Sequence, residues 1–431
     1  MERLAYLTVL ILLLFSLLLS ACGGNHRENT DDGEVQLTMS AWGNPAEIKV
    51  YQKALDAFMA DNPEIKVELV PIPNDGYQDK IMTQLSGGKA PDIFYVGSEW
   101  ISKIVETGKV VDLSDFLSSD ESYVKPDEFA EGLWGAAKIN NQIYGLAVDC
   151  NPFVLYYNKK VLEEAGVKSP QEYYDEGKWN WDTFAEVTAQ IKESGKKGFI
   201  LDGWSGPLFT WIWTNGGEMY DEDGHIILSE NEEAQEAFKY ISDMLQQGNF
   251  TYSGSLPQGQ GGDAMFMSNQ VGFVGAGRWY TPMFSENKAL EFDYIPYPTN
   301  TGEQQGTVSI ATAYMVVNKD SKHLDAAMKF ASFYTSPEGQ KARLEGNGNA
   351  VPSVLGADEI ITEAEFPEHA GYLLDARNKG RVDDKQSVVP GMDKEIMDII
   401  DLMYLGEQSA EQTIQAVTKK ATEMIDEYRN Q

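Results

Sequence analysis

Cysteine and histidine are scarce in this chain of 431 residues, which contains two cysteines and four histidines. Two cysteines cannot build a disulfide framework, and so few thiols and imidazoles leave little material for a zinc site. Basic residues are also under-represented, since 34 lysines and arginines stand against 67 aspartates and glutamates, for a net charge of −33. A surface this acidic repels phosphate backbones, so we expect no nucleic-acid partner.

Catalytic sequence patterns are absent as well. The chain contains no HExxH, CxxC, GxSxG or phosphate-loop motif. The acidic run Asp221–Gly224 lacks the ligand spacing of a calcium loop, and we expect a hairpin turn there. A glycan hydrolase with paired carboxylates stays an alternative, but with 67 acidic residues some pair always looks suitable. We therefore expect no catalytic residue, no metal site and no cofactor.

The chain contains one long hydrophobic run, from Leu4 to Leu19. It is shorter than the ~20 residues that a membrane-spanning helix needs. It is typical of the core of a signal peptide. The residues that follow, Leu19-Ser20-Ala21-Cys22-Gly23, resemble the lipobox of bacterial lipoproteins. This resemblance implies a signal peptide at 1–21 and a diacylated Cys22, which anchors the protein on the outer face of the cytoplasmic membrane. A secreted protein cleaved after Ala21 is the alternative.

Residues 22–34 are expected to form a flexible tether behind the lipid, because positions 23–33 (GGNHRENTDDG) contain no apolar side chain. The folded part starts near Val35 and retains a single thiol, Cys150. No histidine stands close to Cys150 in the sequence, so we expect a buried and unreactive side chain there.

Strands and helices alternate from Val35 onward, which indicates an α/β protein. Apolar patterns predict strands at 35–41, 65–71 and 91–96, and helical spacing predicts helices at 44–59 and 77–85. This order predicts a parallel sheet covered by helices. Further strands are expected at 154–157, 271–274 and 310–317, and further helices at 181–192, 232–246 (capped by Ser229), 324–333, 338–344 and 393–428, the last broken near Gly406. The length suffices for two or three domains.

Aromatic residues are plentiful, at 11% of the chain. Sugar rings present apolar C–H faces bordered by hydroxyls, so a saccharide site needs flat aromatic platforms with carboxylates and amides beside them. Six tryptophans stand in polar or glycine-rich surroundings suited to such a surface: Trp42, Trp100, Trp204, Trp211, Trp213 and Trp279. Three others are expected in the core: Trp134, Trp179 and Trp181.

Motifs spread over most of the chain resemble the sugar-binding family of extracellular solute-binding proteins of ATP-driven importers, the maltose-binding-protein-like family. The most specific is Tyr156-Tyr157-Asn158-Lys159 with the helix after it. Matching segments also occur at 90–96 (APDIFYV), 143–147 (IYGLA), 179–184 (WNWDTF), 266–273 (FMSNQVGF) and 277–279 (GRW).

The resemblance implies a two-lobed α/β fold, periplasmic-binding-protein-like and of type II, with a ligand cleft between lobes joined by hinge crossovers. The N-terminal lobe would comprise residues 35–148 and 310–351, and the C-terminal lobe residues 149–309 and 352–431. The implied partners are a carbohydrate ligand and the permease subunits of an ABC importer, and the protein would act as a monomer without catalysis. A non-sugar polar solute such as a glycerol phosphate is the alternative ligand.

The resemblance also implies a set of ligand-binding residues. Trp279 would be the platform under a sugar ring, and Asp149 and Glu99 would bind hydroxyl groups. The other candidates are Trp42, Asn44, Trp204, Trp211, Asn215 and Arg278.

Overall fold

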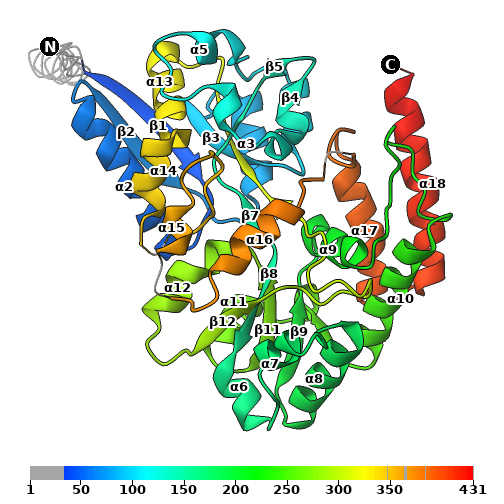
Figure 1. The fold of residues 1–431 in the computed structure, drawn as a ribbon. Coiled ribbons are helices and arrows are strands. Elements are labelled where there is room, and N and C mark those ends of the chain that lie inside the picture. Colours follow the sequence, from blue (N-terminus) through cyan, green and yellow to red (C-terminus); the bar gives the residue numbers. More distant parts are fainter. Residues whose placement is uncertain (1–33, 347, 364–365, 384, 431) are drawn as a thin grey trace, which may run out of the picture. The chain divides into compact units, whose positions relative to one another are not determined.

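The computed structural model describes residues 34–430, with gaps at 347, 364–365 and 384 (Figure 1). The expected signal peptide, Cys22 and nearly all of the expected tether lie outside these residues. From Gln36 onward the chain forms one compact unit. Among the helices of the described residues, none combines the length and hydrophobicity that crossing a membrane requires.

The first of two five-stranded sheets has the strand order β2-β1-β3-β14-β6. Its strands are β1 (Val35–Ala41), β2 (Ile65–Pro71), β3 (Ile93–Gly97), β6 (Leu146–Ala147) and β14 (Ala313–Val317). β1 and β3 are parallel as predicted, but β14 runs antiparallel to both β3 and β6. The parallel arrangement predicted from the first strands therefore holds for β1 and β3, and the sheet is mixed because β14 reaches it from the second half of the chain and not through a local β-α-β connection.

Helices α2 (Pro45–Asp61), α3 (Tyr77–Ser86), α13 (Leu324–Thr335) and α14 (Pro337–Leu344) accompany this sheet, with the shorter α4 (Ile101–Glu106) and α5 (Ser114–Ser118). The long α2 packs against α13 and α14, and the ring of Phe58 lies 5.1 Å from that of Phe330. A small hairpin, β4 (Lys138–Ile139) and β5 (Gln142–Ile143), and short 3-10 turns at 126–128, 131–133 and 135–137 complete this half.

The second sheet has the order β10-β9-β11-β8-β12. Its strands are β8 (Val154–Asn158), β9 (Lys197–Leu201), β10 (Phe250–Tyr252), β11 (Val271–Ala276) and β12 (Phe292–Ile295). β9 is parallel to β10 and β11, whereas β8 is antiparallel to β11 and β12. Every residue of β8, β11 and β12 is buried, which agrees with their nearly continuous apolar sequences.

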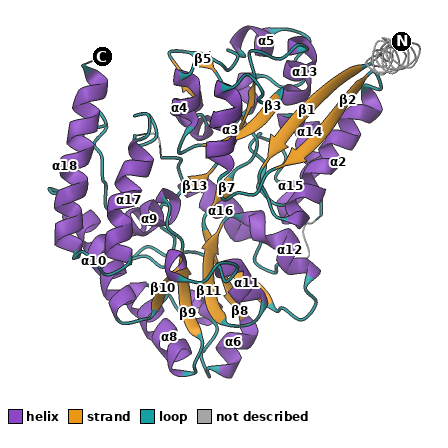
Figure 2. Cartoon of the chain, turned by 180° about the vertical axis from the view of Figure 1, so that it is seen from behind, coloured by secondary structure: helices purple, strands orange, loops and turns teal. Residues whose placement is uncertain are grey.

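In the described part of the chain, ten helices and two short 3-10 turns, at 253–255 and 278–280, belong to this half (Figure 2). The helices are α6 (Lys159–Glu164), α7 (Pro170–Asp175), α8 (Trp181–Glu193), α9 (Ser205–Thr214), α10 (Glu232–Gln246), α11 (Gly262–Met267), α12 (Thr281–Glu286), α16 (Gly371–Lys379), α17 (Met392–Tyr404) and α18 (Ala410–Arg429). The last two pack on each other, and α18 packs on α10. The break between them contains Gly406 with a φ of +75°.

Two local predictions have different outcomes. The N-cap of α10 is Asn231 and not Ser229, because the Asn231 side chain accepts the N–H of Ala234 at 2.8 Å. The hairpin turn expected at Asp221–Gly224 is confirmed, since Tyr220 and Ile226 pair in an antiparallel bridge on either side of it.

Three chain segments connect the two halves and lie side by side. β7 (Asn151–Pro152) pairs antiparallel with β13 (Ile310–Ala311), and Cys150 forms an antiparallel bridge with Val351. Thr312 separates β13 from β14, so the single strand expected at 310–317 is interrupted there. Cys150 is fully buried as expected, and this burial raises the pKa of its thiol. After the third segment the chain passes through the short α15 (Glu359–Thr362) to α16.

Candidate functional site

A pocket lies where the two halves of the fold face each other. It is lined by Ser98 and Glu99 after β3, by the start of α9, by the crossover at Ser309–Ala311, and by Asp383 and Ser387. Its cavity volume is about 10 Å³, which is room for roughly one water molecule. In this form of the protein the cavity is too small for a sugar ring.

Four of the expected ligand residues follow the carboxyl ends of strands. Trp42 follows β1, Glu99 follows β3, Trp204 follows β9 and Trp279 follows β11. All four side chains are partly exposed. Ligands of open α/β sheets collect at such strand ends, so this placement agrees with the sequence-based expectation.

An aromatic cluster brings Trp204 and Trp279 together in the second half. Their ring centroids are 6.5 Å apart, and both lie against Phe153, at 5.4 and 5.7 Å. Gly277 makes room for this arrangement, because a Cβ there would lie 2.4 Å from the ring of Trp279. The two tryptophans thus form an aromatic surface whose Trp204 side lines the pocket.

Trp42 belongs to the first half, and its ring makes edge contacts with Tyr77 and Tyr95 at 5.0 and 5.5 Å. Asn44, two residues later, is the N-cap of α2: its side-chain oxygen accepts the N–H groups of Ala46 and Glu47. Its amide donates to the Glu47 carboxylate at 2.9 Å. Capping thus engages both polar atoms of the Asn44 side chain, and the ligand role expected for it stays a prediction.

Glu99 has an unusual electrostatic environment. Its carboxylate turns back over Gly97, where a Cβ would lie 2.3 Å from Oε1. Although the residue is partly exposed, desolvation of its carboxyl group in the pocket raises the pKa of Glu99 to about 7, and the negative charge of Asp393 adds to this rise. Asp393 lies in the first turn of α17 in the other half, and burial raises its pKa as well.

Asp149 lies in the first crossover and is almost fully buried, outside the pocket lining. Its Oδ2 is 3.8 Å from Nη1 of Arg343, and its Oδ1 accepts the N–H of Ala313 at 3.4 Å. Burial raises the pKa of Asp149 to about 6, although the Arg343 charge opposes the rise. Asp149 thus forms an internal ion pair, and its expected hydroxyl-binding role stays a prediction.

Arg278 is also buried, and its role is to connect segments. Its backbone N–H donates to the Asn151 side chain at 2.9 Å. Its guanidinium donates to the carbonyl oxygens of Ala350 and Gly346, each at 3.1 Å. Burial lowers the pKa of Arg278. This side chain fastens the loop after β11 to the third crossover, and its expected contact with a ligand stays a prediction.

Trp211 is completely buried in α9, with its ring 5.3 Å from Phe250 and 5.4 Å from Tyr297. Asn215 ends the same helix, where its amide donates to the carbonyl oxygen of Glu233 at 2.7 Å. Neither residue lines the pocket, since Trp211 belongs to the core of the second half and Asn215 is bonded to α10; their expected ligand roles stay predictions.

The other tryptophans are buried, which agrees with the sequence-based expectation for three of them and not for two. Trp100 and Trp213, expected on the binding surface, are buried. Trp134, Trp179 and Trp181 are buried as predicted. Local polarity is thus a weak guide, since a tryptophan beside a polar residue can still point into the core.

Several pocket residues had not been found from the sequence. Ser205 and Phe209 start α9, and Asp383 and Ser387 stand in the loop before α17, more than 280 positions after Glu99. Ser102 and Ser387 also join the halves directly, since the Ser102 hydroxyl donates to the Ser387 carbonyl. No motif marks the segment around Asp383, so its place in the pocket follows from the tertiary fold alone.

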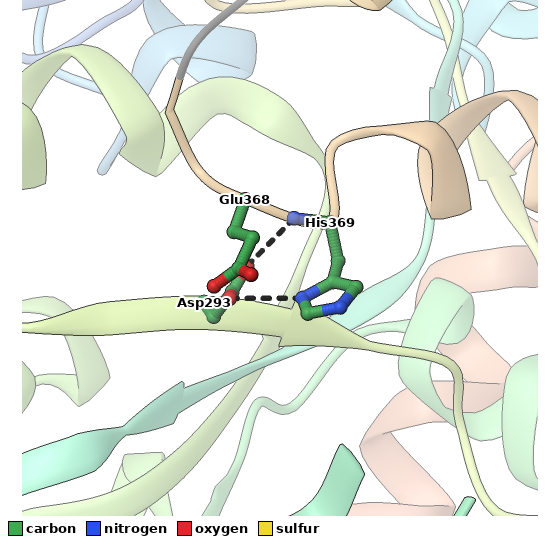
Figure 3. A group of neighbouring side chains, drawn as sticks. All are labelled: Asp293, Glu368 and His369. Carbon is green, nitrogen blue, oxygen red and sulfur yellow. Dashed lines mark hydrogen bonds and ion pairs between the residues drawn. The ribbon is translucent and has the colours of Figure 1, made fainter. Parts of the chain in front are cut away.

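A group of side chains with metal-binding atoms lies elsewhere, outside the pocket lining (Figure 3). Asp293 of β12 makes two hydrogen bonds with His369. Its Oδ1 accepts the backbone N–H of His369 at 3.0 Å, and its Oδ2 lies 3.0 Å from the ring Nδ1. Glu368 lies beside both residues. The ammonium group of Lys159 lies 3.3 Å from Asp293 Oδ2. A metal ion at this group would need the same oxygen atom as a ligand. These contacts fasten the loop at 366–369 to the sheet, and we assign them that structural role.

Two helix-covered sheets joined by three crossing segments, with a pocket between them, define a two-lobed binding protein. Residues 42–341 match the family model of bacterial extracellular solute-binding proteins, and the chain belongs to that family.

Relatives and solved structures agree with this assignment. A protein of Brucella abortus named as a binding protein is 23% identical over 92% of this chain and 94% of its own length. The arabinooligosaccharide-binding protein of Bacillus subtilis is 23% identical over 84% of this chain and 81% of its own. An ABC substrate-binding protein of Listeria monocytogenes, solved with cycloalternan, superposes with a TM-score of 0.80 at 22% identity and covers 91% of this chain and 99% of its own. The two-lobed fold expected from the sequence is thereby confirmed.

Proposed function

We propose that this protein is a lipid-anchored receptor, which binds a sugar or oligosaccharide between its lobes and delivers it to the permease of an ABC importer. The observation that carries the proposal is the aromatic surface of Trp204 and Trp279 beside a pocket that also contains Glu99. Aromatic rings stack on the apolar faces of sugars, and carboxylates accept hydrogen bonds from their hydroxyls. The named ligands of the Bacillus and Listeria relatives support this ligand class.

The three crossing segments would act as the hinge of this receptor. We propose that residues 35–148 with 310–351 and residues 149–309 with 352–431 move as two lobes. The boundary of the first lobe would lie slightly beyond residue 351, because the hydroxyl of Ser353 donates to the Ala147 carbonyl at 2.7 Å. Since the cavity holds only about one water, a sugar would enter an opened form, and closure would then bury it.

A non-sugar phosphate ligand is less compatible with the pocket. Among the described residues that line it, there is no lysine, arginine or histidine that could pair with a phosphate. The lining instead combines hydroxyl groups, aromatic rings and carboxylates, which suits a neutral polyol. Membership of a binding-protein family favours capture over hydrolysis, and we propose that the protein acts as a monomer without catalysis.

Replacing Trp279 by alanine is expected to weaken sugar binding at least tenfold, about 1.4 kcal/mol, because one wall of the aromatic surface is lost. The measurement is a titration of intrinsic tryptophan emission with a panel of neutral mono- and oligosaccharides. The matched control is Trp279→Phe, which keeps an aromatic ring and should retain most of the affinity.

Two outcomes would contradict the proposal. Release of reducing ends during the titration would show that the protein hydrolyses glycans. An unchanged affinity in Trp279→Ala would remove this residue from the ligand site, even if a sugar binds.

The lipid anchor is tested at the protein's own N-terminus. We expect the mature protein from a native host to begin at Cys22 and to carry a diacylglycerol mass on it. The control, Cys22→Ser, should leave an unacylated protein that no longer fractionates with membranes. A mature protein that begins at Cys22 without added lipid would show that it is secreted freely.

A further inference from the structure

One hydrogen bond joins the two proposed lobes at the edge of the pocket. The hydroxyl of Ser102, in α4 of the first lobe, donates to the backbone carbonyl oxygen of Ser387 in the second lobe. Both residues are buried, with exposed fractions of 5% and 2%, so water has little access to this bond. Ser387 lines the pocket and Ser102 does not. Ser102 therefore connects the lobes from outside the pocket lining.

The second-lobe end of this bond is fixed by the neighbouring residue Gln386, which has no exposed surface. The side-chain oxygen of Gln386 accepts the hydroxyl of Tyr220 at 2.8 Å. Its amide nitrogen donates to the carboxylate of Asp393 at 2.8 Å. Tyr220 belongs to the core of the second half, and Asp393 lies in the first turn of α17. Because Gln386 is held on both sides, Ser387 moves with the second lobe and loses Ser102 when the lobes separate.

A second contact between the lobes differs in its exposure. Lys49 of α2 and Glu286 of α12 form an ion pair at 3.0 Å, with side chains that are 68% and 58% exposed. Exposed ion pairs contribute little to stability and are screened by salt. Figure 2 shows α2 and α12 on one side of β7 and β13, and α4 and α17 on the other. The buried bond next to the pocket is therefore the stronger of the two contacts.

We infer that the bond between Ser102 and Ser387 favours the closed arrangement of the lobes, so that part of the protein is closed before a sugar binds. The inference rests on the lobe movement of the proposed function and adds the contact that controls it. All atoms of this contact belong to the chain, so it forms without a ligand. One neutral hydrogen bond changes the ratio of closed to open molecules about fivefold, once the competing bonds to water are counted.

This ratio also acts on the affinity for a sugar. A ligand that binds the closed arrangement has an apparent affinity proportional to the fraction of molecules that are closed. Removing the hydroxyl of Ser102 should therefore weaken sugar binding by up to about fivefold, although Ser102 is outside the pocket lining. Ser102 is thus a positioning residue, which acts through the lobes and not by touching the ligand.

The distance between the lobes, measured without sugar, tests the inference. Spin labels on Ser118→Cys of α5 and Glu186→Cys of α8, both exposed positions, mark one lobe each in the full chain with Cys22→Ser. Cys150 is buried and stays unlabelled. Pulsed electron double resonance should then show a closed and an open population. We expect Ser102→Ala to lower the ratio of closed to open molecules about fivefold.

Ser332→Ala is the matched control. Ser332 is a buried serine of the same lobe, and its hydroxyl donates to the Lys329 carbonyl oxygen at 2.8 Å within α13. The substitution removes a hydrogen bond of the same kind without touching the other lobe, so it should leave the ratio unchanged. Thermal unfolding checks that both variants fold. Raising the salt from about 0.05 M to about 0.5 M should also leave the ratio unchanged, because the inferred contact is neutral.

The outcomes distinguish this inference from the proposed function. A single population in every variant, or an unchanged ratio in Ser102→Ala, overturns the inference, and the sugar titrations decide separately whether the receptor function stands. A ratio that falls with salt but not in Ser102→Ala would assign the closing to Lys49 and Glu286, which equally overturns it. If the ratio falls in Ser102→Ala but no sugar binds, the lobe contact is supported while the proposed ligand class fails.

Discussion

Replacing Trp211 by alanine is expected to lower the free energy of unfolding by about 3–5 kcal/mol, the usual cost of removing a large aromatic side chain from a core. Trp211 has no exposed surface, and its ring contacts Trp181, Phe250 and Tyr297. No side chain can swing into the space without disturbing the neighbouring rings, so a cavity would remain. Urea denaturation followed by circular dichroism measures the effect.

Trp204→Ala is the matched comparison, because Trp204 stands just before the same helix but is partly exposed in the pocket. It should cost much less stability than Trp211→Ala and should weaken sugar binding instead. The opposite pattern, in which Trp211→Ala folds normally and loses affinity, would support the ligand role that the sequence had indicated for Trp211 and would refute the core assignment.

Replacing Asp149 by asparagine is expected to destabilise the protein by about 3–5 kcal/mol, because it leaves a buried guanidinium without its anion. Arg343 has no exposed surface, and its Nε and Nη1 make no hydrogen bond. Its charge is balanced by Asp149 at 3.8 Å, and its Nη2 donates to the Val148 carbonyl. Thermal unfolding monitored by calorimetry measures the loss.

The double variant Asp149→Asn with Arg343→Met separates the ion pair from simple packing. Removing both charges eliminates the unpaired cation, so the double variant should be more stable than Asp149→Asn alone. A double variant whose loss equals the sum of the two single losses would show that the pair has no energetic coupling across the first crossover.

Much of the fold could be predicted from apolar periodicity. β1, β2 and α10 have the predicted boundaries. The alternation that marks the strands and the helical spacing that marks α10 are both contained within the segment itself. The direction of β14 could not be predicted in this way. It depends on how the chain returns to the first sheet from the second, which is a long-range property that local patterns do not encode.

The candidate site was predictable where it follows strand ends. Trp42, Glu99, Trp204 and Trp279 are placed there by the sheet topology, and the sequence marks those ends clearly. Residue type alone does not show which contacts a buried side chain makes. Arg278 and Asp149 have the chemistry of ligand-binding groups, but in the folded protein they satisfy carbonyl oxygens and a guanidinium at the crossovers.

Pocket residues from the C-terminal part of the chain were beyond sequence reasoning. Asp383 and Ser387 reach the pocket because their loop precedes α17, which packs into the second lobe far from the strands that define the site. The full lining of the pocket therefore became visible only in the structure, since it combines Ser98 and Glu99 with residues far along the chain.

The central claim is that a saccharide binds between the lobes, and a crystal structure of the sugar-saturated protein tests it most directly. The account predicts density for the sugar beside Glu99, in contact with the ring of Trp204 or Trp279, with the lobes closed around it. A sugar bound on the outer surface of either lobe, with this pocket empty and the lobes unmoved, would contradict it.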